Sequence, residues 1–493
     1  MPKLTTLLRT LHHESGLPSL TTTGRDAFLI ILARTSRMFA YGASSLVLAL
    51  FFAELGFSDA QIGLFMTLTL LGDVVLSLVL TLVADGVGRR RTLVFGAGLM
   101  MVSGTVFALC EGFWVLLAAA VVGVISATGG DFGPFRAIEE SMMSELTTPG
   151  TRADVLVWYV TLASLGSSVG TEMAGRIVEG LLRGGEGSEG WRLVDAYHAC
   201  FGLYVVMGGV SMACAMALSE RCELRRSPDV QGENENNNNN SENDDSNNNG
   251  ETQRLLGATE PSTTTTTTAP TPPKRSTWTS QISRDSLSIM SILWFLLMVD
   301  SLADGMANMS LTTYYTARKF PHLPKSALGD IVSTSYLLAA LSNIFAGPLA
   351  RHIGLVNTMV FTHIPSSAAV LVFPLAQTVP LTFALLLLRV GLNNMDQAPR
   401  AALIAAVVRA EERTAVMGIT SVVRTVASMT GPSITGVLAG SDKFWIAFVV
   451  AGALRLAYDL GVFAMFVNIR LYKHEIVEET TEEAREEDER QEA

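Results

Sequence analysis

The sequence predicts an all-α polytopic membrane protein whose twelve transmembrane helices form two pseudo-symmetric six-helix bundles. Three observations support this fold class. Of the 493 residues, 49% are hydrophobic and only 16% are charged, whereas a water-soluble chain needs more charge to cover its surface. Twelve segments are long and apolar enough to cross a bilayer, and one long polar segment divides them six and six. The lipid bilayer is therefore the expected environment of most of the chain.

The apolar segments set the boundaries of the predicted helices, because a helix needs about 20 mostly apolar residues to span a bilayer. In the first half of the chain they lie at 27–53, 60–84, 92–110, 114–142, 153–180 and 194–219. In the second half they lie at 287–317, 327–350, 355–377, 381–408, 413–439 and 444–468. The first helix is expected to act as its own insertion signal, since no cleavable signal peptide is visible.

The chain divides into five predicted regions: an N-terminal segment (1–26), a first bundle (27–220), a linker (221–285), a second bundle (286–470) and an acidic tail (471–493). The linker contains NENNNNNSENDDSNNN and six consecutive threonines, so it has too little apolar surface to order itself and is predicted to be disordered. An even number of helices places both termini and the linker on one side. The charges of these segments and the basic run Arg89–Arg91 predict that this side is cytosolic.

The rest of the composition argues against several classes of protein. Much of the net charge of −11 comes from the acidic tail, which is typical of a solvated segment and gives little reason to expect a specific basic partner. No nucleic-acid partner is expected either. The four cysteines have no metal-ligand spacing and are expected to be packing residues. The sequence has no nucleotide loop, no paired Cys/His metal motif and no nucleophile elbow, so we expect no enzymatic activity, metal or cofactor.

An internal repeat supports the division into two halves. GGDFGPFR in the fourth predicted helix matches NMDQAPR in the tenth, and the match continues into the next helix of each half. The equivalent positions are Asp131, Pro134, Arg152, Gly170 and Gly175 in the first half and Asp396, Pro399, Arg413, Gly431 and Gly436 in the second. Only the intervening loop differs in length. Repeated halves of this kind are how one large class of transporters builds a central site.

The loop after the second helix, TLVADGVGRRRTL, carries a recognisable signature. It matches the pattern Gly-x-x-x-Asp-Arg-x-Gly-Arg-Arg at Asp85, Gly88, Arg89 and Arg90, and departs from it at Thr81 and Gly86. With its helix count, linker position and repeat, the chain resembles the major facilitator superfamily along its whole length. The resemblance implies two six-helix halves that rock about a midplane site, and we expect a monomer.

The resemblance also implies a role for the signature as part of a cytosolic gate. Asp85 would accept hydrogen bonds from the exposed amides at the start of the eleventh helix, near Thr414, where the helix dipole is positive. Gly88 would let the loop turn tightly, with Arg89 and Arg90 following it. The alternative is that the basic run only fixes the topology.

Ionisable side chains inside the membrane are the candidate site residues, because a charge in hydrocarbon is costly and usually faces a partner or a watery cavity. The family resemblance implies that helices 1, 4, 7 and 10 line the central cavity, and most of these charges fall on those helices. The predicted substrate and proton pathway consists of Arg34, Arg37, Tyr41, Asp131, Arg136, Asp300, Asp304, Asp396, Arg400 and Arg424. Asp131 is the first choice, because the glycines and proline around it loosen the helix and free backbone groups for a ligand.

Local ion pairs are the alternative for several charges. Three pairs lie four residues apart, where side chains share a helix face: Glu172–Arg176, Arg455–Asp459 and Asp396–Arg400. The first two are predicted to be structural, and the third fits a local pair and a substrate contact equally well. Glu139 and Glu140 are expected to face water near the headgroups. Asp73, in the middle of the second helix, has no obvious local partner.

These patterns favour a secondary active transporter that moves a small polar or anionic solute by alternating access. A proton is a candidate coupling ion, carried by Asp131 or else by Asp300 or Asp304, and Arg37 with either of the latter is a candidate switchable contact between the halves. Arg37→Ala and Asp131→Asn are predicted to abolish transport while leaving expression intact. The alternative is a nutrient sensor that signals through the linker and the tail.

The linker also contains a candidate address. Glu251, Leu255 and Leu256 in ETQRLL fit an acidic dileucine sorting signal, which a sorting adaptor would bind as an extended peptide. The expected location is the plasma membrane or, if this motif is used, a vacuolar or lysosomal membrane.

Overall fold

The computed structural model describes residues 20, 22–123, 125, 134–184, 191–222, 284–397, 399–400, 403–404 and 413–466. Asp131, the acidic tail, the sorting motif and nearly all of the linker lie outside this part of the chain, and the side chain of Asp85 is not described. Within the described residues the regular elements are helical and there is no strand. The first half contains α3 (Arg25–Glu54), α4 (Asp59–Val87), α5 (Arg89–Leu109), α6 (Phe113–Gly123), α7 (Pro134–Leu146), α8 (Pro149–Gly184), α9 (Leu193–Ala217) and η1 (Glu220–Cys222).

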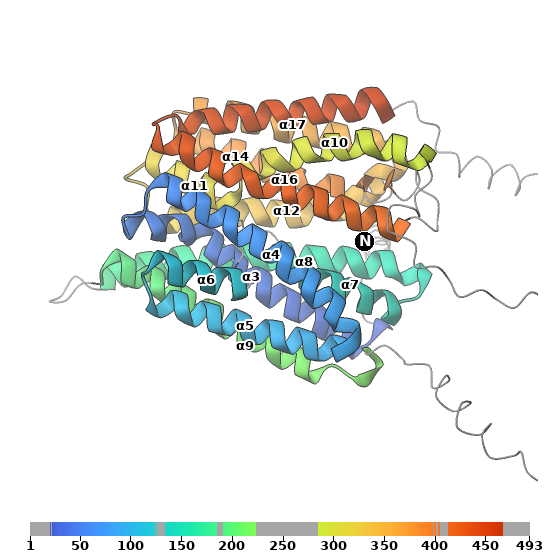
Figure 1. Cartoon of the computed structure of the whole chain (residues 1–493). Helices are drawn as coiled ribbons and strands as arrows, with labels where there is room; N and C mark the ends of the chain where they lie inside the picture. Colours follow the sequence, from blue (N-terminus) through green and yellow to red (C-terminus); the bar gives the residue numbers. More distant parts are fainter. Residues whose placement is uncertain are drawn as a thin grey trace, which may run out of the picture.

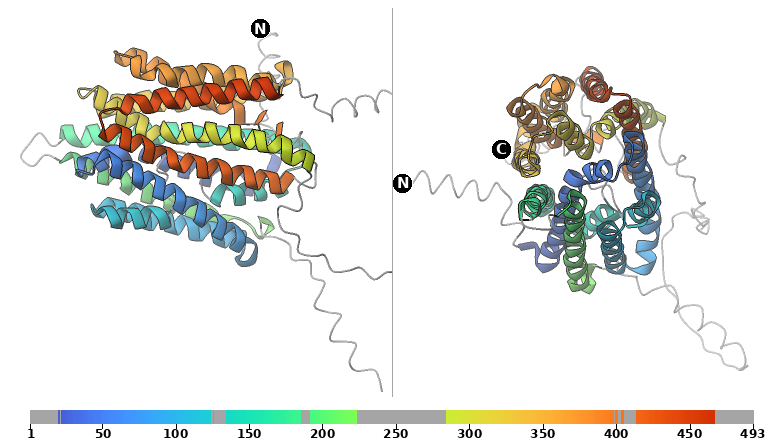
Figure 2. Two further views of the ribbon diagram at one scale, coloured as in Figure 1. Left: turned by 45° about the horizontal axis from the view of Figure 1, so that its top comes forward. Right: turned by 90° about the vertical axis from the view of Figure 1, so that its left-hand side faces the viewer.

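The second half contains α10 (Arg284–Met306), α11 (Met309–Lys319), α12 (Lys325–Ile353), α13 (Leu355–Val372), η3 (Phe373–Leu375), α14 (Val379–Asn393), η4 (Asn394–Asp396), α16 (Arg413–Gly440) and α17 (Phe444–Phe466). The helices run roughly side by side in two bundles that follow the two halves of the sequence (Figures 1 and 2). Eight of the described helices are long and apolar enough to cross a membrane. The all-helical, two-bundle fold class of a polytopic membrane protein is confirmed, and the described helices are consistent with the predicted count of twelve.

The seventh predicted span, 287–317, is divided into α10 and α11, which corrects its prediction as one continuous helix. Asn308 separates them and caps α11, its side-chain oxygen accepting a hydrogen bond from the Leu311 amide over 2.9 Å. The break frees the carbonyl of Ala307, which accepts a hydrogen bond from Arg389 of α14. The same guanidinium donates to the Thr312 hydroxyl over 2.8 Å. Arg389 therefore stabilises the interrupted helix, because a carbonyl at this depth has no water to bind.

The repeated glycines have equivalent positions in both halves, and this confirms the internal repeat. A Cβ on Gly170 would lie 1.9 Å from the Phe39 carbonyl oxygen of α3, and one on Gly431 would lie 2.3 Å from the Met306 amide of α10. These glycines pack each bundle internally. Gly175 and Gly436 meet the opposite half: their Cβ atoms would lie 2.9 Å from the Lys325 carbonyl and 2.5 Å from the Asp59 carbonyl. Small residues at these crossings let the helix backbones approach closely.

Candidate functional site

The two halves are joined at one end of the bundles. We call this the closed end, where α3 ends and α12 begins, and the opposite end, where α9 ends and α10 begins, the linker end. On one side of the interface α8 packs against α12, with 3.1 Å between the Ser168 and Ser333 hydroxyls and 3.0 Å between Arg176 and Asp330. Arg176 also binds Glu172 over 2.7 Å, so the predicted local pair is confirmed and extended across the halves.

On the other side of the interface, α4 packs against α16 and receives side chains from α11. Asp59, the first residue of α4, accepts hydrogen bonds from the Tyr314 hydroxyl over 2.6 Å and from Arg318 over 2.8 Å. Ser433 of α16 hydrogen bonds to Thr67 over 2.7 Å. Among the described residues, the polar contacts between the halves run from mid-helix to the closed end. These described contacts hold the halves together at the closed end.

A buried ion pair lies within the first bundle toward the linker end. Arg37 of α3 binds Glu139 of α7 over 2.7 Å, and both side chains are only 1% exposed. Glu139 also accepts a hydrogen bond from the Tyr159 hydroxyl over 2.9 Å, and the Arg37 guanidinium lies 4.4 Å from the centre of the Phe135 ring. The expectation that Glu139 faces water is therefore wrong. The predicted contact of Arg37 with Asp300 or Asp304 is not formed either, because Arg37 has this partner in its own half.

Three other predicted pathway residues of the first half also have local partners. The Arg34 guanidinium lies over the Tyr159 ring, 4.0 Å from its centre. Tyr41 stacks on Tyr204 with 6.2 Å between ring centres. Arg136 forms an i,i+4 ion pair of 2.7 Å with Glu140, and both of these side chains are 40% exposed.

The signature loop is fastened to its own bundle in the part that is described. Gly88 has φ of 109°, a backbone conformation that favours glycine, and α5 begins immediately after it. Arg89 binds Glu145 of α7 over 2.7 Å, and Arg90 donates a hydrogen bond to the Met216 carbonyl of α9. Contacts of Asp85 with the start of α16 lie outside the described residues, so the gate stays a prediction.

A larger group of charges converges in the middle of the second bundle, where each span is deepest in the membrane. We call it the charged cluster. It consists of Asp300, Asp304, His363, Arg389, Asp396, Arg400, Arg424, Arg455 and Asp459. These residues come from α10, α13, α14, η4, α16, α17 and the segment after η4. Such a concentration of buried charge costs folding free energy, and ionisable groups at this depth are candidate functional residues for that reason.

His363 of α13 joins the two charges of α17. Its Nδ1 lies 2.6 Å from Asp459 Oδ1, and its Nε2 lies 2.7 Å from the Arg455 guanidinium. Ser367 donates a hydrogen bond to the other Asp459 oxygen over 2.8 Å. The prediction that Arg455 and Asp459 neutralise each other is therefore wrong, because both turn toward α13.

Asp300 and Asp304, one turn apart on α10, have different environments. Asp300 is 0% exposed, and its carboxylate lies 3.8 Å from both His363 Nε2 and Arg400. Neither of its oxygens has a hydrogen-bond partner among the described residues. The Asp304 side chain is 35% exposed and lies 3.3 Å from Arg455. The cluster thus has a buried, unsatisfied carboxylate on one side and a more accessible one on the other.

The predicted pathway residues of the tenth and eleventh spans complete the cluster. Asp396 and Arg400 form an i,i+4 ion pair, which is one of the two interpretations that their spacing leaves open. Arg424 of α16 is half-buried and donates a hydrogen bond to the Ser301 hydroxyl over 3.2 Å. Five predicted residues therefore meet in one place: Asp300, Asp304, Asp396, Arg400 and Arg424.

His363 and Arg455 are the important residues that sequence reasoning does not single out. Free imidazole is largely neutral at pH 7, so His363 does not count among the intramembrane charges. The sequence feature that could have identified His363 is its position in the middle of an otherwise apolar span, since polar groups at that depth are rare. Spacing alone assigns Arg455 to a local pair.

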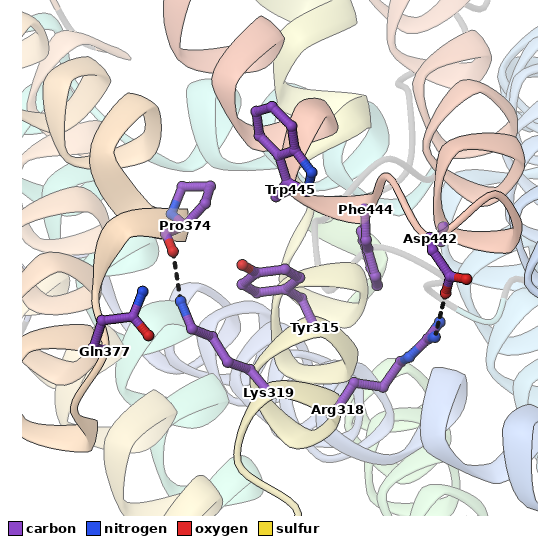
Figure 3. A pocket seen from close by; sticks show the side chains of 9 residues that line it. Tyr315, Arg318, Lys319, Pro374, Gln377, Asp442, Phe444 and Trp445 are labelled. Atoms are coloured by element: carbon purple, nitrogen blue, oxygen red, sulfur yellow. Dashed lines mark hydrogen bonds and ion pairs between the residues drawn. The ribbon is translucent and has the colours of Figure 1, made fainter.

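A recess of about 380 Å³ opens at the closed end of the second bundle, away from the charged cluster. It is lined by Tyr315, Arg318, Lys319, Pro374, Gln377, Ala439, Asp442, Phe444 and Trp445. Figure 3 shows that its two cations are already engaged: Lys319 donates to the Pro374 carbonyl over 2.6 Å, and Arg318 lies 3.8 Å from Asp442. Arg318 also holds Asp59 of the other half, so the recess belongs to the structure that joins the halves.

Two six-helix bundles closed at one end, with buried charges at mid-membrane, define a polytopic membrane transporter. The family model of the Major Facilitator Superfamily matches residues 30–321 and 293–490. The chain belongs to this superfamily. It is 31% identical over 446 residues to the uncharacterized membrane protein YJR124C of Saccharomyces cerevisiae, covering 90% of this chain and 95% of that protein.

Solved structures of transporters share the fold. A mutant of the nucleoside transporter NupG has a TM-score of 0.62 at 11% identity, covering 90% of this chain and all of that one. A bacterial homologue of the human lysosomal transporter Spinster, in an inward-facing and occupied conformation, has a TM-score of 0.59 at 14% identity over 89% of this chain and 95% of its own. The human organic anion transporter MFSD10 has a TM-score of 0.55 at 14% identity, over 89% of this chain and all of its own.

Proposed function

We propose that this protein is a secondary active transporter that moves a small polar or anionic solute by alternating access. The charged cluster is the observation that carries the proposal. Four arginines converge there from different helices, and Arg424 and Asp304 remain partly exposed. Guanidinium groups recognise carboxylates, phosphates and other planar or anionic groups through paired hydrogen bonds. A solute that reached the cluster from the linker end would find donors already in place.

The inter-half contacts support alternating access as the mechanism. The halves meet at the closed end through close backbone crossings and hydrogen bonds between small side chains such as Ser168 with Ser333. Such contacts are individually weak, so they can separate when the halves rock. Binding energy at the cluster would then be available to shift the balance between the two arrangements, provided that the solute binds one of them more tightly.

A screen of solutes against the purified protein tests the proposal. A ligand at a hundred times its dissociation constant should stabilise the folded state by about 2.7 kcal/mol, which thermal unfolding can detect. We expect this stabilisation to be lost in Arg424→Gln and kept in Lys319→Gln, which alters the recess of Figure 3. The stabilising solute should then exchange across vesicles that contain the protein. Stabilisation that is kept in Arg424→Gln and lost in Lys319→Gln would show that the solute binds in the recess instead. A solute that binds but does not exchange across the vesicles would contradict transport.

A further inference from the structure

The hydrogen bonds of His363 define its protonation state. A guanidinium group has only donors, so the Arg455 group 2.7 Å from Nε2 requires an unprotonated Nε2 that accepts. The proton must then be on Nδ1, from which it is donated to Asp459 over 2.6 Å. Ser367 occupies the second oxygen of that carboxylate. His363 is therefore a neutral imidazole with both nitrogens engaged.

Among the described carboxylates near His363, Asp300 is the one that this arrangement leaves unsatisfied. Its oxygens have no hydrogen-bond donor although the side chain is fully buried, and such a group is costly to hold. The nearest nitrogens are His363 Nε2 and an Arg400 nitrogen, both 3.8 Å away, and that Arg400 nitrogen also lacks a partner. A proton on Nε2 would give this carboxylate a hydrogen-bond donor, because Nε2 needs to move by only about 1 Å to reach hydrogen-bond distance.

The described groups around His363 balance in charge. Asp300, Arg455, Asp459, Ser367 and the Tyr458 ring lie against His363, and the charged cluster adds Asp304, Arg389, Asp396, Arg400 and Arg424 around them. Four arginines face four aspartates, so the cluster is formally neutral while His363 is neutral. One added proton leaves one positive charge in excess. In a membrane interior an uncompensated charge is unfavourable, and a bound anion would compensate it.

We propose that the charged cluster binds an anionic solute together with one proton, and that His363 Nε2 carries the proton. This deepens the proposed function and rests on it. The Nε2 lone pair forms the new N–H bond, the Arg455 hydrogen bond to that nitrogen breaks, and no redox change occurs. The new Nε2–H of the imidazolium then donates a hydrogen bond to the Asp300 carboxylate. Arg455 keeps its hydrogen bond to Asn393 and its position 3.3 Å from the partly exposed Asp304, and the donor released from His363 can bind the carboxylate, sulfonate or similar anionic group of the solute.

The dependence of anion binding on pH tests this assignment. The probes are small carboxylates and sulfonates that stay fully ionised between about pH 5.5 and 8, such as lactate, methanesulfonate and isethionate, each compared with chloride at equal ionic strength. Thermal unfolding of the purified full-length protein, titrated with each probe, gives apparent dissociation constants. If the anion binds together with one proton, its affinity should fall by up to about tenfold for each unit by which the pH rises. An equal affinity at all pH values, or no response to any probe at about pH 5.5, would overturn the proposal.

The pH dependence of anion binding in single-residue variants tests which residue carries the proton. His363→Gln should remove the pH dependence, because glutamine does not titrate. The matched control is His198→Gln in the first bundle, where Nδ1 bonds to the Phe107 carbonyl, and this variant should keep it. Asp300→Asn should also flatten the dependence, since the imidazolium then loses its partner. A pH dependence that survives in folded His363→Gln but vanishes in Asp300→Asn would place the proton on the carboxylate and refute the assignment. Solute exchange that occurs without any pH dependence would refute this inference and leave the transport function standing.

Discussion

A disulfide between residues 168 and 333 is expected to stop transport completely. Ser168 of α8 and Ser333 of α12 lie in the part of the interface between mid-helix and the closed end, with their hydroxyl oxygens 3.1 Å apart. Cysteines at both positions would therefore bring their sulfurs within reach of each other. Rocking of the halves must separate this contact. Oxidised Ser168→Cys/Ser333→Cys protein should therefore bind solute from the linker end but exchange none, and a reducing agent should restore the flux.

The controls for this experiment are available in the chain itself. Each single cysteine variant should transport normally under oxidising conditions, because the four native cysteines are free and three of them are buried. A second pair, Thr67→Cys/Ser433→Cys, joins α4 to α16 across the other side of the interface, where the hydroxyls lie 2.7 Å apart. It should lock the protein in the same way. Continued flux through fully cross-linked protein would show that the halves do not part at the closed end.

Arg37→Ala is expected to destabilise the protein by about 3–5 kcal/mol, because it leaves the Glu139 carboxylate buried without its charge partner. The loss should appear as a lower unfolding temperature and poor recovery from the membrane. Sequence alone predicts a transport defect with normal expression, and the buried pair changes that expectation. The double variant Arg37→Ala/Glu139→Gln should regain much of the stability, since the unpaired charge is gone.

Arg136→Ala provides the comparison for Arg37→Ala. Arg136 is in the same bundle and also pairs with a glutamate over 2.7 Å, but both partners are 40% exposed. An exposed pair of this kind contributes about 0–1 kcal/mol, so this variant should unfold close to the wild-type temperature. If both arginine variants unfold alike, or if the double variant is no more stable than Arg37→Ala, the Arg37–Glu139 pair does not have the structural role assigned to it.

The fold class is predictable from the sequence because the bilayer imposes a strong constraint on length and hydropathy. Helix positions follow from apolar segments, and the repeated glycines Gly170 and Gly431 mark equivalent helix crossings in the two halves. The break at Asn308 escapes prediction because no proline marks it, and an asparagine alone does not require a helix to end. The cap formed by Asn308 and the guanidinium of Arg389, which is distant in the chain, make the interruption favourable.

The candidate site is predictable in part. The cost of burying a charge identifies five pathway residues that do gather in the second bundle. Their partners are not predictable, because spacing along a helix reports only local neighbours. Arg37 pairs with Glu139, 102 residues later, and Arg455 and Asp459 both turn to His363 on another helix, although they are correctly spaced to bind each other.

Uptake driven by a pH gradient tests the central claim most directly. The full-length protein is reconstituted into vesicles, and the uptake of an anion that stabilises it is measured with and without an acidic exterior. We predict that the gradient drives accumulation of the anion above its external concentration in wild type and in His198→Gln. His363→Gln should show no accumulation. The account would be contradicted if anion uptake were the same with and without the gradient, or if wild type and His363→Gln responded equally to it. Either result would show that the anion and the proton do not cross together through the charged cluster.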